Sequence, residues 1–501
     1  ASAACTFIGG GTLNTVSKFF SSIVGGISNT VSCTSSTIGG GKSNTISAYY
    51  GFIGGGTLNQ ILNGCNFIGG GSSNTTSGYY SSIVGGLSNS NSGYYSSIVG
   101  GSQNTISSGY GSVGFIGGGI LNKISSEKSS IVGGCRNLVS GNVSSIVGGS
   151  NNTASAACSF IGGGDNNTIS GYYGFFIGGG SNNTVSSQYF STIVGGSINS
   201  STADCTFIGG GICNVTSGDA SVVVGGASNT SSAFYSFIGG GIKNIASGNS
   251  STVVGGTLNT ASAACTFIGG GCSNSISNYD ATNKFDIIVG GENNTISNGY
   301  GSINNTIVGG KDNTISNPNT RFGFIGAGCN NTLSGASCNT VIAGGSNNNA
   351  TANNVFIGGG SNNTLGSSYY PHDSFLGAGT SNTIDNCGCS VIVGGHCNTM
   401  SDYEGYFNII VGGCCNTNSG AYANKNVIVG GACNKMITPF KCYSFIGGGF
   451  QNLVNNNHSS IVGGTLNTAS AACSSIVGGE NNNILPTHSH AFIIGSNLTS
   501  T

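Results

Sequence analysis

The side chains that could do chemistry in this sequence are 19 cysteines, 5 histidines and 13 acidic residues. Acid–base catalysis needs two such groups at a fixed spacing, and covalent catalysis needs a nucleophile beside a base. The acidic residues and histidines are scattered, and no pair of carboxylates returns at the same place in the sequence. The glycine-rich stretches are not followed by a helix, as a phosphate-binding loop would be. We therefore predict that the protein is not an enzyme and uses no cofactor.

The cysteines recur at equivalent places in a repeated sequence. Six lie two residues before a predicted strand, and four directly precede a fixed asparagine: Cys5, Cys65, Cys158, Cys205, Cys265 and Cys473, then Cys213, Cys397, Cys415 and Cys433. We predict that they are small side chains tolerated at one corner, with disulfides between coils or chains as the alternative. The densest group is Cys387, Cys389, Cys397, Cys414 and Cys415, which lacks the Cys-x-x-Cys pairs and histidines typical of a zinc site.

Pairs of aromatic residues also recur, at the place where a loop is expected. We predict that the tyrosine pairs lie on the surface, where they could stack on sugars or contact a neighbouring fibre. The alternative is that they cover a groove between subunits. The predicted contact residues are Tyr49, Tyr50, Tyr79, Tyr80, Tyr94, Tyr95, Tyr172, Tyr173, Tyr369 and Tyr370.

A tandem repeat sets the elements that must position these groups. The pattern Gly-Gly-x-x-Asn occurs about thirty times, most often every 15 residues, and the extra residues of longer units follow the asparagine half. Glycine at a fixed place indicates a turn with positive φ or a corner where no Cβ fits. We predict structural turns at these corners, represented by Gly10, Gly11, Asn14, Gly25, Gly26, Asn29, Gly85, Gly86 and Asn89.

The residues before each glycine pair predict a strand with two occupied faces. Isoleucine almost always stands six residues before the asparagine, which indicates an inward-facing ladder. The residues directly before and after this isoleucine covary in size. Where Phe precedes it, Gly follows it, and where Val follows it, a small or aliphatic residue precedes it. We interpret this covariation as close packing against other subunits. The predicted subunit-packing face comprises Phe7, Gly9, Ser22, Val24, Phe52, Gly54, Ser82 and Val84.

Two short strands per coil, glycines at the bends and no helix signal predict an all-β fold. The fold class is a repetitive parallel β-roll or β-helix solenoid of about 31 coils, each of 15–20 residues. By loop length the chain divides into regular repeats at 1–274, repeats with longer insertions at 275–451, and regular repeats with a shortened last coil at 452–501.

Charge and hydropathy exclude two classes of partner. The formal net charge is −1, with 12 Lys and Arg spread along the chain, so no basic stripe is available for nucleic acid. The longest apolar runs are about five residues, far short of the roughly 20 needed to cross a bilayer. We therefore predict neither nucleic-acid binding nor membrane insertion.

The stretches "SSIVGGLSNSNSGYYSSIVGG" and "FIGGGSSNTTSGYY" resemble the head repeats of trimeric autotransporter adhesins. Similar arrays occur in phage tail fibres and in surface fibres of large DNA viruses. The resemblance implies left-handed parallel β-rolls that interlock as a homotrimer, with the Phe/Gly and Ser/Val face between subunits. Resemblance to the tips of phage fibres also implies that a trimer could gather His488 and His490 around one metal ion; the alternative is a polar end loop.

These observations predict a non-catalytic extracellular fibre or filament. It would be a rigid rod, as in a viral or phage fibre or an adhesin shaft, on the surface of a virion or cell. Its first partner would be itself, in a homotrimer that could join others end to end or laterally. Its second partner would be a host-surface glycan or protein, bound near residues 275–450. The alternative is an ice-binding solenoid that uses the Thr-x-Ser ladder, although Lys123, Leu138, Lys435 and Leu453 interrupt that ladder.

Overall fold

The computed structural model describes residues 2–107, 109, 111–278, 285–299, 303–316, 320–335, 338–366, 372–438 and 443–501. The chain divides into two compact units, Ala1–Ile242 and Lys243–Thr501. Within the described ranges both units consist of short parallel strands and turns, without a helix. The predicted fold class is confirmed, because each unit is a parallel β-solenoid and the odd-numbered strands number 31 in all. The homotrimer stays a prediction.

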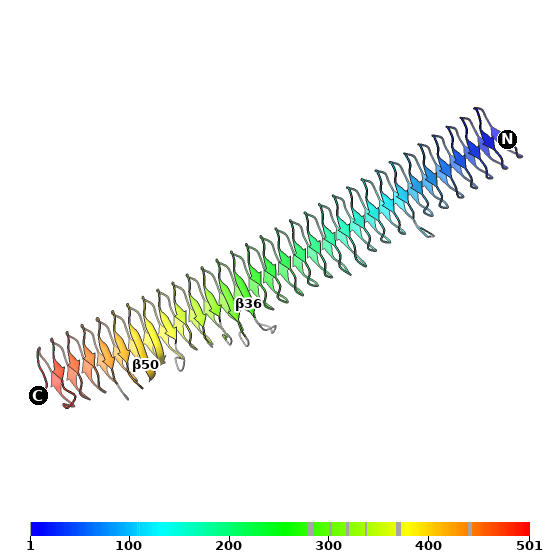
Figure 1. The fold of residues 1–501 in the computed structure, drawn as a ribbon. Coiled ribbons are helices and arrows are strands. Elements are labelled where there is room, and N and C mark those ends of the chain that lie inside the picture. The colour runs from blue at the N-terminus through cyan, green and yellow to red at the C-terminus, as the bar shows by residue number, and fades with distance from the viewer. Residues whose placement is uncertain are drawn as a thin grey trace. The chain divides into compact units, whose positions relative to one another are not determined.

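Each coil of the first unit contains two strands of two residues. In the first coil these are β1 (Phe7–Ile8) and β2 (Thr15–Val16), and in the second β3 (Ser22–Ile23) and β4 (Thr30–Val31). Strand β1 pairs in parallel with β3, and β2 pairs in parallel with β4. Odd-numbered strands therefore form one sheet and even-numbered strands form the other (Figure 1). This pattern runs to β31 (Phe237–Ile238) in this unit.

The core lies between the two sheets and is made of one residue from each strand. The second residue of a strand points inward, so Ile23 and Val31 are fully buried, as are Ile38 and Ile46 one coil later. The predicted inward ladders are thus confirmed on both halves of the coil. Since only one apolar side chain per strand fills the space, the core is narrow and continues from coil to coil.

The second unit extends from β32 (Ile245–Ala246) to β61 (Phe492–Ile493) and follows the same plan. Its even-numbered sheet contains the strands that are longer than two residues: β36 (Ser275–Asn278), β38 (Thr295–Asn298), β40 (Thr314–Ser316), β42 (Thr332–Ser334), β46 (Thr364–Gly366), β48 (Thr383–Gly388), β50 (Thr399–Tyr406), β52 (Thr417–Ser419) and β54 (Lys435–Ile437).

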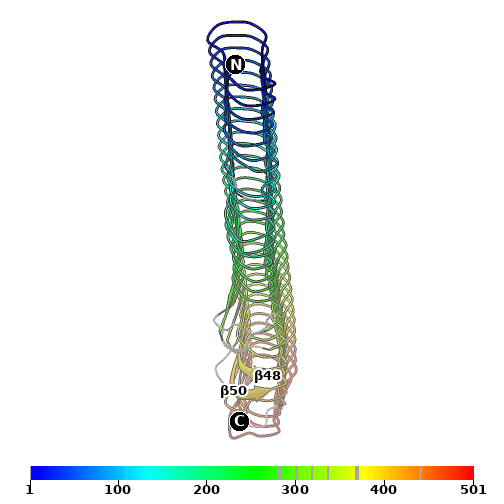
Figure 2. The same ribbon diagram turned by 90° about the vertical axis from the view of Figure 1, so that its right-hand side faces the viewer.

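Strands β48 and β50 lie side by side and are the longest pair (Figure 2). Their register shifts between Asp385 and Cys387, where Asn386 has a positive φ of 57°. Such a bulge turns the following side chains to the other face. As a result Cys387 points into the core, where it is fully buried.

The described part of the chain contains no helix that could span a bilayer. The three-part division by loop length, with borders at 275 and 452, stays a prediction.

Candidate functional site

The second glycine of each corner has a backbone that requires glycine. Gly11, Gly26 and Gly86 have φ values of 88°, 99° and 100°. A Cβ on Gly11 would lie 1.9 Å from the carbonyl oxygen of Gly26, and one on Gly86 would lie 2.2 Å from that of Gly101. Both reasons given by the sequence, positive φ and close approach of coils, therefore apply at this position.

The first glycine of each corner lies in open space. A Cβ added to Gly10, Gly25 or Gly85 would meet no heavy atom within 4 Å. Ala327 and Ala378 occupy this position in two other coils. Nothing inside the chain therefore requires glycine here, and the row of first glycines leaves a strip of backbone without side chains.

The corner asparagines form a ladder of hydrogen bonds, and from Asn29 to Asn482 they are buried, whereas Asn14 in the first coil is half-buried. The backbone N–H of Asn29 donates to the Oδ1 of Asn14 at 3.0 Å, and that of Asn104 donates to the Oδ1 of Asn89 at 3.0 Å. The Asn89 Nδ2 donates to the Gly85 carbonyl at 3.1 Å and to the Gly101 carbonyl at 3.1 Å. The sequence predicted a turn residue, and the structure adds that one amide joins three backbone groups from successive coils.

The predicted subunit-packing face is exposed in the single chain. Phe7 is 55% exposed, Val24 56% and Val84 50%. Phe52 and Gly54 follow the same plan as Phe7 and Gly9, and the rings of Phe52 and Phe67 stack with their centroids 5.6 Å apart. Ser22 and Ser82 are half-buried on the same face.

The size covariation on this face has a cause inside one chain. A Cβ on Gly9 would lie 2.5 Å from the Val24 carbonyl oxygen and 3.0 Å from Cε1 of Phe7. The phenylalanine ring therefore lies against the glycine that directly follows its two-residue strand. The covariation therefore has an explanation within one chain. Packing of this face against other subunits stays a prediction, and the support for it is the exposed apolar area.

Two tyrosine pairs of the first unit, in successive coils, stack on each other. The rings of Tyr79 and Tyr94 have centroids 5.5 Å apart, and those of Tyr80 and Tyr95 lie 5.0 Å apart. These four residues line a shallow surface pocket of about 410 Å³. The charge of the nearby Cys65, followed by that of Tyr95, raises the pKa of the Tyr80 hydroxyl.

The other predicted contact residues are also at corners. Tyr49 and Tyr50 are 61% and 68% exposed, and Tyr172 and Tyr173 are 69% and 43% exposed. Tyr369 and Tyr370 lie outside the described residues. The sequence thus indicated surface aromatics, and the structure arranges several of them into rows.

A second aromatic pocket, of about 560 Å³, lies in the second unit. Its lining consists of Tyr406, Phe407, Asn424, Lys425, Tyr443 and His458. The Lys425 ammonium donates a hydrogen bond to the Tyr443 hydroxyl at 2.9 Å and lies 4.7 Å from the centre of that ring. A cation beside aromatic rings suits an acidic saccharide, so this pocket is a candidate for the contact predicted near residues 275–450.

Among the residues that the structure describes, the predicted metal ligands His488 and His490 belong to no group of three or more possible ligands. The Nδ1 of His488 lies 3.0 Å from the Ser500 hydroxyl, and the His490 N–H donates to the Ala472 carbonyl at 3.1 Å. The proposed ion would need several chains, so this site stays a prediction.

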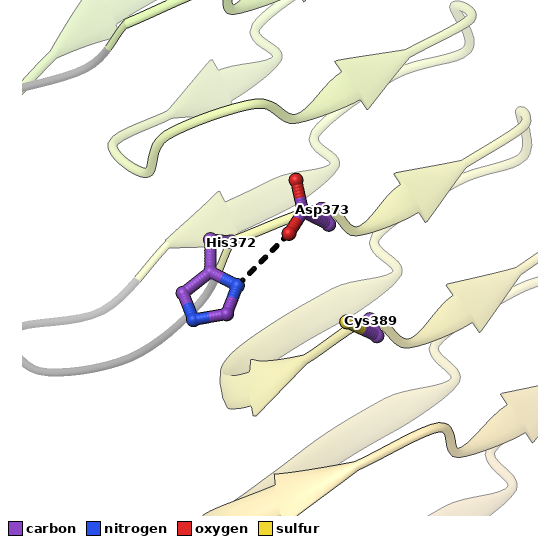
Figure 3. A group of neighbouring side chains, drawn as sticks. All are labelled: His372, Asp373 and Cys389. Carbon is purple, nitrogen blue, oxygen red and sulfur yellow. Dashed lines mark hydrogen bonds and ion pairs between the residues drawn. The ribbon is translucent and has the colours of Figure 1, made fainter.

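A different group of possible metal ligands lies in the second unit. His372, Asp373 and Cys389 hold their ligand atoms within 4.8 Å of one another, and no other set of three or more was found among the described residues (Figure 3). Burial, and then the charge of Asp373, raises the pKa of the Cys389 thiol. The sequence indicated a cysteine group here but missed His372, which belongs to the preceding coil.

The densest cysteine group is split by the fold. Cys387 is buried in the core, whereas Cys389 lies at a corner of the surface. The sulfur atoms of Cys414 and Cys415 lie 3.3 Å apart, and Cys397 lies 3.2 Å from His396. All the cysteines in the described ranges are free thiols.

A buried carboxyl group lies beside Cys387. Asp402 is fully buried, and its backbone N–H donates to the Cys387 sulfur at 3.2 Å. Its Oδ2 accepts a hydrogen bond from the Asn408 Nδ2 at 2.8 Å. Burial raises the pKa of Asp402 to about 7, because a charged carboxylate is poorly solvated in the core.

Comparisons with known proteins give no identification. No protein-family model matches the chain, and a search of curated proteins finds no match. The resemblance to adhesin-type repeats therefore rests on the sequence pattern, and what the structure supports is a parallel β-solenoid of about 31 coils.

Proposed function

We propose that the chain is a non-catalytic structural subunit of an extracellular fibre or filament. Its odd-numbered strands would pack against other copies, as a homotrimer, and its corner loops would contact a surface. The observation that carries this proposal is the row of exposed apolar side chains on the odd-numbered sheet, for example Phe7, Val24 and Val84.

The size of this row favours a partner. If each coil exposes roughly 70 Å² of a Phe or Val side chain, the first unit alone presents on the order of 1,000 Å². Monomeric soluble proteins rarely expose contiguous apolar patches above a few hundred Å², and a stable interface needs about 800 Å² from each partner. The strip of backbone at Gly10, Gly25 and Gly85 would let a second chain approach closely.

The test is the mass of the protein in solution. Val24, Val84 and Val99 are changed together to Glu, and a matched variant carries Glu at Thr30, Thr75 and Thr105 of the even-numbered sheet. The unchanged protein should have the mass of a trimer or larger assembly, the valine variant that of a monomer, and the threonine variant the larger mass. A monomeric unchanged protein across the accessible concentrations would refute the proposal.

Ice binding is the second candidate, favoured by the threonine row on the even-numbered sheet. Thr15, Thr30 and Thr45 stand opposite one another in register, one step per coil. The next residue in the row is Gln60, and Lys123 and Leu138 interrupt it later. Measurement of thermal hysteresis distinguishes the two functions, because a fibre subunit should give none.

A further inference from the structure

Three side chains from two successive coils of the second unit face one point on the surface. The Nδ1 of His372 lies 3.1 Å from the Oδ2 of Asp373, and the Cys389 sulfur completes a group whose ligand atoms all lie within 4.8 Å (Figure 3). The group contains one imidazole, one carboxylate and one thiol. It lies in the part of the chain with the longest insertions.

The backbone fixes this arrangement. Asp373 and Cys389 have φ values of 59° and 49° and stand at the same corner of consecutive coils. The Cys389 N–H donates to the His372 carbonyl at 2.8 Å, which ties the two coils together at the group. On the other side, His372 forms a parallel bridge with Asn353. The three residues are therefore held by the ladder that stacks the coils.

The chemistry of the group suits a zinc-like ion. Imidazole nitrogen, carboxylate oxygen and thiolate sulfur are all ligands of Zn²⁺, whereas Ca²⁺ and Mg²⁺ prefer oxygen alone. Around tetrahedral Zn²⁺ the ligand atoms lie about 3.5 Å from one another. His372 and Asp373 are already at 3.1 Å, so only the separations that involve Cys389 would contract, by up to about 1.3 Å. Three protein ligands leave a fourth position for water.

We propose that His372, Asp373 and Cys389 bind one Zn²⁺ ion that clamps two successive coils. This site is additional to the proposed fibre function and does not depend on it. The clamp would stabilise the corner where long insertions enter and leave the solenoid.

The thiols near residue 400 are the competing site. Cys414 lies beside Cys415, and Cys397 lies beside His396, but these contacts join neighbours in sequence and bring together no third ligand within 4.8 Å among the described residues. The experiment must therefore distinguish the two groups of thiols.

The test is a Co²⁺ titration of the reduced, metal-free full chain, followed by displacement with Zn²⁺. The ligand variants use residues that the chain itself places at equivalent corners: His372→Asn as at Asn353, Asp373→Asn as at Asn354, and Cys389→Ser as at Ser35. Each should weaken binding by more than the roughly 10–100-fold that follows loss of an outer-shell partner. Cys389→Ser should also abolish the thiolate-to-cobalt absorption band of this site.

Cys65→Ser is the matched control, because Cys65 is also a corner cysteine, with φ of 58°. It should leave both affinity and spectrum unchanged. Zn²⁺ should also slow hydrogen exchange at the Cys389 amide in the unchanged protein but not in Cys389→Ser. The proposal is overturned if the unchanged chain binds no Co²⁺. It is equally overturned if the band survives in Cys389→Ser and disappears when Cys397, Cys414 and Cys415 are changed to Ser.

Discussion

At the scale of residues, the corner asparagine is the main polar group of the solenoid interior. The Asn259 Nδ2 donates hydrogen bonds to the Gly255 and Gly271 carbonyls at 2.9 Å and 3.0 Å. The Oδ1 of Asn259 accepts a hydrogen bond from the Asn274 N–H at 2.9 Å. An aspartate could not donate these bonds, and an apolar residue could form none of them. The corner therefore requires a side-chain amide, because only an amide both donates and accepts these hydrogen bonds.

Asn259→Ala should destabilise its coil strongly. The change leaves the Asn274 N–H and the Gly255 carbonyl without this partner, at a cost of about 1–3 kcal/mol for each unsatisfied group, while the Gly271 carbonyl keeps the hydrogen bond from the Thr257 N–H. The measurement is the free energy of opening from hydrogen exchange at Asn274 and its neighbours. Asn249→Ala is the control, since Asn249 is exposed at a loop corner. Equal effects of the two changes would contradict a structural role for the ladder.

The raised pKa of Asp402 predicts that the stability of the fold decreases as the pH rises. Its folded-state pKa of about 7 lies above that of an exposed aspartate, so the fold prefers the protonated form. The contribution of protonated Asp402 to the free energy of unfolding is complete below about pH 4 and is lost as the pH rises through about 7. The total loss is up to about 4 kcal/mol.

The variant Asp402→Asn should remove this dependence. Asparagine keeps an oxygen for the Asn408 amide and carries no charge at any pH. Local hydrogen exchange around β50, with its pH dependence corrected for intrinsic exchange rates, should then give the same opening free energy at pH 5 and pH 8. Asp165→Asn at an exposed site should leave the wild-type profile unchanged. A profile in Asp402→Asn that matches the wild type would show that another group is responsible.

At the scale of the elements, the glycine pair combines two different environments in adjacent residues. The first glycine faces open space, and the second is pressed against the next coil with positive φ. Strands of two residues cannot hold a coil by themselves, so this corner and the asparagine ladder fix where each strand begins. In coils with the Phe-x-Gly pattern, the phenylalanine ring also lies against the glycine that follows its strand.

The same substitution at Gly85 and Gly86 should therefore have opposite outcomes. Gly85→Ala should change the opening free energy by less than about 0.5 kcal/mol, as for other exposed sites. Gly86→Ala should cost more than about 3 kcal/mol, because its Cβ meets the Gly101 carbonyl and its φ disfavours any side chain. Hydrogen exchange at Gly101 and nearby amides measures both. A small effect at Gly86 would mean that the coils can separate at this corner.

At the scale of the whole molecule, the coils within a unit are interchangeable parts. Stability in such arrays is close to a sum of coil terms and contacts between adjacent coils. Removing one complete repeat should therefore cost little, whereas a change of spacing inside a repeat should be severe.

Deletion of residues 83–97 removes one 15-residue repeat and joins Ser82 to Ile98, which restores the same sequence pattern. We expect a folded protein whose circular dichroism spectrum and melting temperature are close to those of the unchanged chain. Deletion of Ser88 alone should instead disrupt the coil, because Asn89 leaves the ladder while the glycines stay in place. If both deletions behaved alike, the fixed spacing between the glycines and the asparagine would not be what holds the register.

The sequence determined the period of the coil, the inward isoleucine ladder, the corner positions and the surface aromatics. These follow from local rules, since side chains alternate along a strand and glycine alone tolerates certain backbones. The same rules could not show that Asn89 is buried or that Gly85 and Gly86 differ, because both depend on what the neighbouring coil places beside them.

Only the tertiary structure brought His372 to Cys389 and separated Cys389 from Cys387. Loop length varies from coil to coil, so distance along the sequence does not show which corner residues stack. The bulge between Asp385 and Cys387 then turns one cysteine inward, while the next lies at a left-handed corner on the surface. The repeat thus fixes the frame, whereas stacking and irregularities between coils decide which chemical groups meet.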